Sequence, residues 1–564
     1  MKYQMKKLFT LLSVAFSWLL ASATSYEGKL QVFINGQQMS SQQAEIVVNA
    51  QSDGRYALSL RNFVLETDET QLPVGNVSLK DVDASICGTS NVMHTFQTIQ
   101  LEPGDDASAG WIGPQLPAVD VDVNAVVNEQ NQLNAVISID ATATLGMVIR
   151  VLFGSHVYQV ANSGFEDFHV AKLYKVKTVD GKYEFDYDST PVTSDEPDYW
   201  HSFMSASGYD KNGVNQLNIV YLAGTAPHTF VSDQTRPGST GKSSLLLKSS
   251  SIFGIVANGT VTTGRINAGS INVVADAQGD WLNHSWNDMS QTELGQDGHP
   301  FYTCLDGRPD SLAVWVKFAQ GDPDKAAGYP YASINAVIND GSYYQDPEPA
   351  GVTYTNVLAK ANNNEIAVTD GQWKRIVLPF DYASYALNQA KGRVILVTAS
   401  TNAGAGKGSG NDELYMDDME LIYNCRLSAV SLKGISLSGF SSDKTDYKGI
   451  TVKGLLSPND IEVETNGQGA YVIKKVENII DETSQNPVQA RISLIVVSGD
   501  LSQSVTYTIV ADYDPDSVSA VSMNKTAPST IYDVQGRLVR SASAPGIYII
   551  KDASGKTIKR YQRR

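Results

Sequence analysis

The sequence predicts an all-β protein built from several domains, and three observations carry this prediction. Tyrosine is abundant, with 27 residues among 564. Many segments alternate apolar and polar residues, which is the period of a half-buried strand. No long segment with helical periodicity follows the N-terminal apolar run. Since one domain usually takes about 100–200 residues, we expect roughly three to five domains.

Composition and charge exclude some classes of partner. Hydrophobic residues make up 42% and charged residues 18%, a globular rather than a disordered composition. The formal net charge is −17. Because such a surface repels phosphate backbones, we expect no nucleic-acid partner. The balance suits a soluble exported protein or a cation binder.

The first 23 residues have the pattern of a signal peptide. Three lysines precede an apolar run at 8–20, which is too short to span a bilayer comfortably. Ala21-Ser22-Ala23 then gives a small-x-small cleavage pattern, so we expect cleavage after Ala23. A membrane anchor is the alternative. We expect no transmembrane segment further on, and a location outside the cell or on its surface.

Residues 24–155 alternate in a run of short segments separated by turns, which indicates a sandwich or a closed barrel. Segments 26–30, 72–77 and 147–154 resemble the calycin-like domain of Bacteroidetes surface proteins, which implies an N-terminal calycin-like β-barrel over 24–155. We expect side chains to fill this barrel, as in many small barrels, rather than a ligand. The expected strands are 29–34, 44–48, 56–60, 74–79, 119–127, 134–139 and 147–153.

Residues 156–424 form the largest block. The order of its motifs resembles the carbohydrate metabolism domain of exported Bacteroidetes proteins, and the resemblance covers about 260 residues. It implies a galactose-binding-like jelly roll. The motifs that carry it are 164–166, 197–202, 241–248, 257–264, 300–301, 308–312, 314–318 and 413–421.

Two smaller units follow. Segments 427–430, 437–440 and 445–447 resemble the openings of cadherin-like domains, which implies a small β-sandwich over 425–513 that acts as a spacer. Three segments in 514–564 resemble the C-terminal sorting domain of the type IX secretion pathway: 531–539, 545–551 and 555–560. That resemblance implies export by the type IX machinery. The alternative is a last β-hairpin with a solvated basic tail.

Several motif searches give no site. Segment 238–243 is close to a phosphate-binding loop, but Arg236 stands where that motif needs glycine, so we predict a turn entering a strand. The three cysteines form no disulfide framework. Cys304 and Cys425 could pair if the fold brings them together, which would leave Cys87 as a small apolar residue.

An acidic pair near the end of the central block is the strongest local signal. Strict alternation places Asp417 on one face with Met419 and Leu421, and Asp418 on the other face nearer water. Carbohydrate-binding jelly rolls that begin with Gly-Phe-Glu and end with Tyr-x-Asp-Asp resemble this arrangement. The resemblance implies a structural calcium held by Glu166 and Asp417, with Asp418 beside them. An acidic strand end without metal is the alternative.

The second signal is aromatic. Five rings lie beside polar turn residues, and sugar rings stack on such faces while nearby polar groups bind the hydroxyls. The alternative for each ring is a place in the core, which we expect for Trp315 and Trp373. The candidate carbohydrate-binding residues are Trp200, Trp281, Trp286, Tyr343 and Tyr344.

These patterns together predict a non-catalytic, exported carbohydrate-binding protein involved in glycan capture or use. One alternative is a glycoside hydrolase that uses paired carboxylates on the jelly roll. The other is a structural surface adhesin. No Gly-x-Ser-x-Gly or His-Glu-x-x-His motif is present, and the seven histidines are spread singly.

Overall fold

The computed structural model describes residues 23–514, apart from 40, 52–53, 67–70, 253, 272–282, 326–327, 405 and 482–485. Beyond 514 it describes the backbone of four strands. The predicted signal peptide, except Ala23, lies outside the described residues. Strands dominate the described chain, so the all-β prediction is confirmed.

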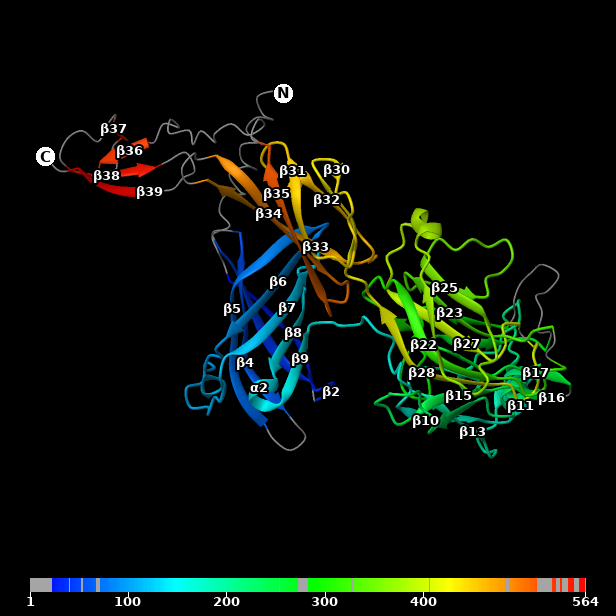
Figure 1. Cartoon of the computed structure of the whole chain (residues 1–564). Coiled ribbons are helices and arrows are strands. Elements are labelled where there is room, and N and C mark those ends of the chain that lie inside the picture. Colours follow the sequence, from blue (N-terminus) through cyan, green and yellow to red (C-terminus); the bar gives the residue numbers. More distant parts are fainter. Residues whose placement is uncertain are drawn as a thin grey trace, which may run out of the picture.

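The N-terminal strands close into a barrel (Figure 1). Eight long antiparallel strands follow one another around it, and β1 pairs with β9 to complete the ring. The strands are β1 (Thr24–Ile34), β3 (Gln42–Ala50), β4 (Tyr56–Glu66), β5 (Gln71–Cys87), β6 (Ser90–Ile99), β7 (Val119–Val127), β8 (Leu133–Ala141) and β9 (Met147–Phe153); β2 (Gln37–Gln38) extends β1, and α2 spans Thr142–Leu145.

Apolar side chains fill the barrel interior. Each of the eight long strands contributes inward residues to one buried cluster, including Leu30, Phe63 and Phe153, all at most 2% exposed. Alternation along the strands produces this result, because every second side chain points into the ring. The interior is therefore a packed core, as the sequence predicted.

Two sheets pack face to face in the central block and form a β-sandwich. Every second residue of the facing strands enters the shared core, as Leu312, Val314 and Val316 do. One sheet has the order β14 (Thr229–Ser232), β15 (Ser244–Lys248), β28 (Glu413–Ile422), β22 (Ser311–Ala319), β26 (Lys374–Pro379). The other has β18 (Thr260–Thr262), β27 (Val394–Ser400), β23 (Ala332–Asn339), β25 (Val357–Ile366), with β21 (Thr303–Cys304) beside β27.

Shorter elements cover the outside of this sandwich. They comprise β10 (Phe168–Leu173) paired with β13 (Val192–Pro197), β11 (Val176–Val179) with β12 (Lys182–Phe185), β16 (Ser250–Ile252) with β17 (Ile255–Ala257), the sheet β19 (Arg265–Ala268), β20 (Asn283–Asn287), β24 (Tyr344–Asp346), and the helix α3 (Leu217–Gly224). Short 3₁₀ segments lie at Phe203–Ser205 and Ala383–Asn388 in this block, at Gly113–Gln115 in the barrel region, and at Pro458–Asp460 further along the chain.

A second, smaller sandwich follows the central one in sequence but packs on the barrel (Figure 1). A buried apolar cluster joins Val92 and Val126 of the barrel to Ile473 and Leu501 of this sandwich. Its sheets are β30 (Ile435–Ser436), β29 (Leu427–Leu432), β32 (Ile461–Thr465), and β31 (Asp446–Val452), β35 (Ser504–Tyr513), β34 (Pro487–Val497), β33 (Tyr471–Ile480), with β31 and β35 parallel. The unit is therefore docked against the barrel.

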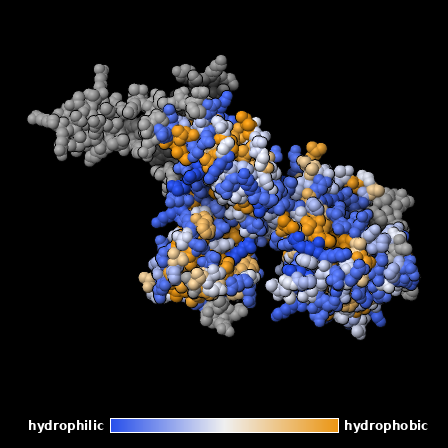
Figure 2. Space-filling view, in the orientation of Figure 1, coloured by the Kyte–Doolittle hydropathy of each residue, from blue (hydrophilic) through white to orange (hydrophobic). Residues whose placement is uncertain are grey.

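The C-terminal segment forms a four-stranded sheet in the order β37-β36-β38-β39. Its strands are β36 (Thr530–Asp533), β37 (Leu538–Val539), β38 (Gly546–Lys551) and β39 (Thr557–Gln562). Strands thus form in the three predicted segments, while their identity as a sorting domain stays a prediction. Figure 2 shows that one face of the molecule is largely hydrophilic, with hydrophobic side chains gathered in patches.

Candidate functional site

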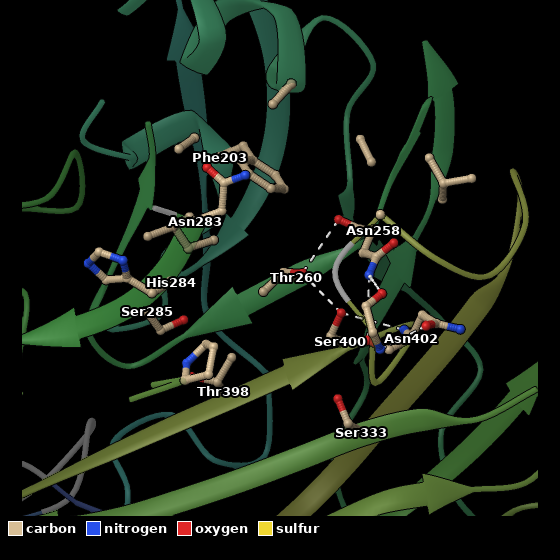
Figure 3. Close-up of a pocket in the computed structure, with 18 of the residues that line it drawn as sticks. Phe203, Asn258, Thr260, Asn283, His284, Ser285, Ser333, Thr398, Ser400 and Asn402 are labelled. Atoms are coloured by element: carbon tan, nitrogen blue, oxygen red, sulfur yellow. Dashed lines mark hydrogen bonds between the residues drawn. The ribbon is translucent and has the colours of Figure 1, made fainter. Parts of the chain in front are cut away.

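A cleft lies on the outer face of the β18-β27-β23-β25 sheet (Figure 3). Alternation builds its polar wall. Ile334 and Ala399 point into the core, whereas their neighbours Ser333, Asn335 and Ser400 line the cleft. The sheet therefore presents a row of hydroxyl and amide groups to a space of about 410 Å³. That volume falls in the range of about 300–1,000 Å³ common for small-molecule sites.

The opposite wall of the cleft is mostly apolar. Phe203, Ile219 and Leu222 come from the segment around α3, and Ile252 and Ile255 come from the β16–β17 hairpin. The α3 segment precedes the first strand of the sandwich, and the hairpin is inserted between β15 and β18. Together they cover part of the sheet face and give the cleft one polar and one apolar side.

Two of the residues that line this cleft carry a buried acceptor without a partner among the described residues. The side-chain oxygens Oδ1 of Asn258 and Asn335 are buried and lack a hydrogen-bond partner among the described residues. Asp346 also lines the cleft, and the Asn335 amide donates to its Oδ2 at 3.4 Å. Loss of solvation raises the pKa of the Asp346 carboxyl, although nearby Lys360 opposes the shift. The cleft thus offers hydroxyl, amide and carboxyl groups to a ligand that forms hydrogen bonds.

Two of the predicted stacking rings lie in the core. Trp200 is fully buried, contacts Phe165 with ring centroids 5.2 Å apart, and donates from its indole nitrogen to the Ala161 carbonyl at 3.1 Å. Tyr344 is also fully buried, beneath Tyr354. Neither ring offers a face to a ligand, so the structure argues against a stacking role for both. Both rings are buried because they pack against segments distant in sequence, although their neighbours in sequence are polar.

Two other predicted rings form a partly exposed pair. Trp286 and Tyr343 have ring centroids 5.9 Å apart, and Tyr343 is 43% exposed. The Tyr343 hydroxyl lies 3.4 Å from Nε2 of His284, which lines the cleft. The pair therefore adjoins the rim of the cleft. Trp281, the fifth candidate, lies outside the described residues.

The placement of Trp315 and Trp373 corrects another prediction. Both are only partly buried. Trp315 lies on β22, on the outer face of the β14-β15-β28-β22-β26 sheet, and Trp373 directly precedes β26 of the same sheet. Lys317 lies over the rings of Trp373 and Tyr415, at 5.4 and 3.9 Å from their centroids. Trp315 alternates with Val314 and Val316, which fill the core, so its own side chain must point outward.

A β-bulge alters the predicted faces around the acidic pair. Opposite Ala313–Trp315 the register shifts, and Asp418 has a positive φ of 41°. Leu414 and Met416 enter the core before the bulge, and Met419 and Leu421 enter it afterwards. Strict alternation had predicted that Asp417 shares a face with Met419 and Leu421. The bulge makes this prediction wrong, because Met419 and Leu421 enter the core whereas Asp417 lies on the other face.

Asp417 is nevertheless fully buried. Its Oδ2 accepts from the Arg236 backbone at 2.7 Å, while its Oδ1 lacks a partner among the described residues. Burial, together with the charges of Asp418 and Glu166, raises the pKa of Asp417 to about 6. Asp418 pairs with the Arg236 guanidinium at 2.5 Å.

The loop at 238–243 is a turn that enters β15, as predicted. Its amides hold a carboxylate: Lys242 N–H and Ser243 N–H donate to Glu166 Oε2 at 2.9 and 3.3 Å. A Cβ at Gly241 would lie 1.9 Å from Glu166 Oε1, so glycine is required for this close approach.

These contacts fit the predicted calcium site in part. Asp417 Oδ1 is an available oxygen ligand, and a cation would offset both the burial of the Asp417 carboxylate, which is the main cause of its raised pKa, and the nearby charges of Asp418 and Glu166. Asp418 and Glu166 already have partners in Arg236 and the loop amides. A calcium ion would bind Asp417 directly and take Glu166 and Asp418 only after those contacts rearrange.

The cleft wall was missed at the sequence level, although its signal is present. Residues 332–335 and 397–400 alternate small apolar residues with serine, threonine and asparagine. Such a pattern predicts a strand with one polar face, and several of them in one sheet predict a polar surface. The covering segments carry no comparable signal. The three cysteines, also left open, are free in the structure.

Comparison with solved structures finds three Bacteroides proteins at low similarity. A candidate glycoside hydrolase of Bacteroides thetaiotaomicron is 14% identical, covers 61% of this chain and 87% of its own, and has a TM-score of 0.28. An outer membrane protein of Bacteroides fragilis is 10% identical, covers 68% of this chain and 97% of its own, and has a TM-score of 0.16. SGBP-B from a complex xyloglucan utilization locus in Bacteroides uniformis is 11% identical, covers 71% of this chain and 98% of its own, and has a TM-score of 0.16. At TM-scores this low, none supports a functional conclusion.

A search of curated proteins found no match. Among the described residues, no helix has both the length and the apolar character needed to cross a membrane. Residues 23–155 match the family model of the calycin-like beta-barrel domain, and the closed ring of β1 to β9 has the expected fold. The barrel of this chain is therefore a calycin-like β-barrel domain.

Proposed function

We propose that this protein binds carbohydrate in the cleft of its central sandwich, as part of glycan capture or use. The observation that carries the proposal is the row of hydroxyl and amide side chains, such as Ser333 and Asn335, opposite an apolar wall that contains Phe203. Sugars match this chemistry, because their hydroxyls donate hydrogen bonds while the C–H faces of their rings are apolar.

The aromatic pair at the rim extends the proposed site. Tyr343 is exposed, is held beside Trp286, and contacts His284 of the cleft. A sugar unit that leaves the cleft could stack on this pair, so the site would accommodate an oligosaccharide rather than a single sugar.

A glycan array with the full chain tests the proposal, and the hits define the ligand for titration. Asn335→Ala should weaken binding by about fivefold, since loss of one hydrogen bond removes about 1 kcal/mol. Tyr343→Ala should also weaken binding without lowering the Tm. Tyr187→Ala is the matched control, because this tyrosine is 71% exposed and does not line the cleft. If the wild-type chain binds no glycan, the proposal fails and the adhesin alternative gains support.

The glycoside hydrolase alternative rests on Asp346. A hydrolase needs a second carboxyl about 5–5.5 Å or about 6.5–9.5 Å from the first. Asp346 is the only carboxylate among the described residues that line the cleft, so a second carboxyl would have to come from outside this lining. Release of reducing sugar by the wild type, lost in Asp346→Asn while binding persists, would favour the hydrolase.

Export to the cell surface is part of the same proposal. We expect the secreted chain to begin at Thr24, which N-terminal sequencing would detect. Deletion of 518–564 should leave the protein in the periplasm if this segment is recognised by the type IX machinery. Normal surface display of the deletion variant would contradict the sorting role.

A structural calcium at Asp417, with Glu166 and Asp418, also remains a proposal. The unpartnered Asp417 Oδ1 supports it. The ion would tie the segment before β10 to β28, the last strand of the central sandwich.

A further inference from the structure

We propose that His169, Asp198 and Asp297 bind a divalent transition-metal ion of the zinc class, at a site separate from the cleft. One donor atom from each residue lies within 4.8 Å of the others, and this is the single such group among the described residues. His169 Nδ1 and Asp198 Oδ1 are 2.9 Å apart. Two ligands that lie about 2.0–2.1 Å from one ion are separated by roughly 3.0–3.4 Å, so the His169–Asp198 pair must open slightly and the remaining donor must approach by at most about 2 Å.

Three separate segments bring these residues together. His169 lies on β10 directly opposite Glu196 of β13, and Asp198 follows the end of β13. Asp297 arrives from a later turn, where its Oδ2 accepts from Tyr199 N–H at 2.7 Å and its Oδ1 from His299 N–H at 3.0 Å. Backbone contacts therefore fix the carboxylate in place before any ion binds, which favours binding.

A buried carboxylate stands behind the histidine. Glu196 is fully buried, and its Oε2 lies 3.4 Å from His169 Nε2. Ser205 Oγ donates to the same carboxylate at 2.6 Å. Histidines that bind metal usually donate their other ring N–H to a carboxylate, which orients the ring and sets the tautomer. Without an ion, Nδ1–H donates to Asp198 Oδ1, and the 3.4 Å contact of Nε2 with Glu196 does not have hydrogen-bond geometry. An ion at Nδ1 would displace that proton, and a small rotation of the ring would then let Nε2–H donate to Glu196.

His201 lies close to this group but outside it. Its ring is fully buried, and neither ring nitrogen has a hydrogen-bond partner among the described residues. A Cβ at Gly295 would lie 2.6 Å from His201 Cε1 and 2.7 Å from Asp297 Oδ1, so Gly295 separates the imidazole from the carboxylate. The His201 nitrogens are not among the converging donor atoms, so the proposed site has three protein ligands.

The donor set selects the class of ion. Calcium and magnesium prefer oxygen ligands alone, whereas imidazole nitrogen with carboxylate oxygen suits zinc and its first-row neighbours. Three carboxylates, Glu196, Asp198 and Asp297, also gather around His169. A divalent cation would offset this negative charge. The partial exposure of Asp198 and Asp297 leaves a coordination position open to water.

Metal binding by the full chain tests the proposal. After the chain is stripped with chelator, ZnCl₂ titrated by calorimetry should bind with high affinity at this site, and CaCl₂ should not compete. Asp198→Asn combined with Asp297→Asn should weaken zinc binding by at least about 100-fold, and Glu196→Gln by about 10–100-fold. Asp195→Asn is the control, because Asp195 lies on β13 and is not in the converging group.

Zinc that binds the double variant as tightly as the wild type would overturn the proposal, as would competition by calcium. If the double variant does not fold, Co²⁺ decides the question in the wild-type chain. A visible absorption band that zinc displaces supports a site with nitrogen and oxygen ligands, and the absence of a band overturns it. Glycan binding is measured separately, so either proposal can fail without the other.

Discussion

The barrel and the central sandwich use the same alternation of side chains with different results. In the barrel, the inward face closes on itself and apolar residues fill it. In the sandwich, one face of the β18-β27-β23-β25 sheet enters the core, and the other, polar face is partly covered by the α3 segment and the β16–β17 hairpin. A cleft therefore arises where other segments cover a polar sheet face. Strand patterns that look alike in sequence can thus build either a core or a binding site.

If the barrel interior is a packed core, its large rings stabilise the fold rather than bind a ligand. Phe153→Ala should destabilise the barrel by about 3–5 kcal/mol, because it leaves a cavity. Thermal unfolding of the full chain measures the loss. Phe96→Ala on the outer face is the matched control, since Phe96 is 63% exposed, and it should change the Tm little. Equal effects of the two variants would contradict a filled barrel.

Two tryptophans of the central sandwich distinguish core from rim. Trp200→Ala should cost about 3–5 kcal/mol of folding stability, because the ring is fully buried. Trp286→Ala should leave the Tm nearly unchanged and weaken glycan binding, because this ring is paired with Tyr343 near the cleft. Melting curves and titrations with array hits measure both effects. A stable Trp200→Ala variant that loses binding would restore the stacking role predicted from sequence.

Calcium should stabilise the sandwich, and nothing comparable should occur in the barrel. Binding at 100 times the dissociation constant stabilises a fold by about 2.7 kcal/mol. A calcium-selective chelator should therefore lower the Tm of the wild-type central sandwich and barely change that of Asp417→Ala. Equal responses of the two proteins would favour an acidic strand end without metal. Added zinc should not reverse the effect.

The buried carboxyl of Asp346 should lower the free energy of unfolding near neutral pH, whereas the apolar barrel core should have no such effect. The pKa of Asp346 is raised in the folded state, mainly by loss of solvation. The folded chain therefore holds this proton more tightly than the unfolded chain, and the resulting stability is lost as pH rises through the folded pKa. Asp346→Asn should raise the Tm near neutral pH, and the gain should shrink toward pH 4 or so. A gain that is independent of pH would contradict this assignment.

Much of the fold follows from local pattern. Alternation in segments such as 119–127 and 134–139 predicted strands that the structure contains as β7 and β8. The same pattern places Trp315 on the outside, although its apolar neighbours suggested the core. The site was predicted less well, because Asn258 and Asn335 have no distinctive neighbours in sequence. Of the five predicted rings, the structure places Trp286 and Tyr343 beside the cleft.

The sequence by itself determined the all-β class and the turn that leads into β15, since each depends on the spacing of residues within one segment. Closure of the barrel depends on the pairing of β1 with β9, far apart in the chain. Only the tertiary structure decided which face of the sandwich sheet becomes a cleft. It also decided that Trp200 is buried, that a bulge at Asp418 reverses the predicted faces, and that His169 meets Asp297. These features depend on contacts between segments far apart in the chain, which local periodicity does not encode.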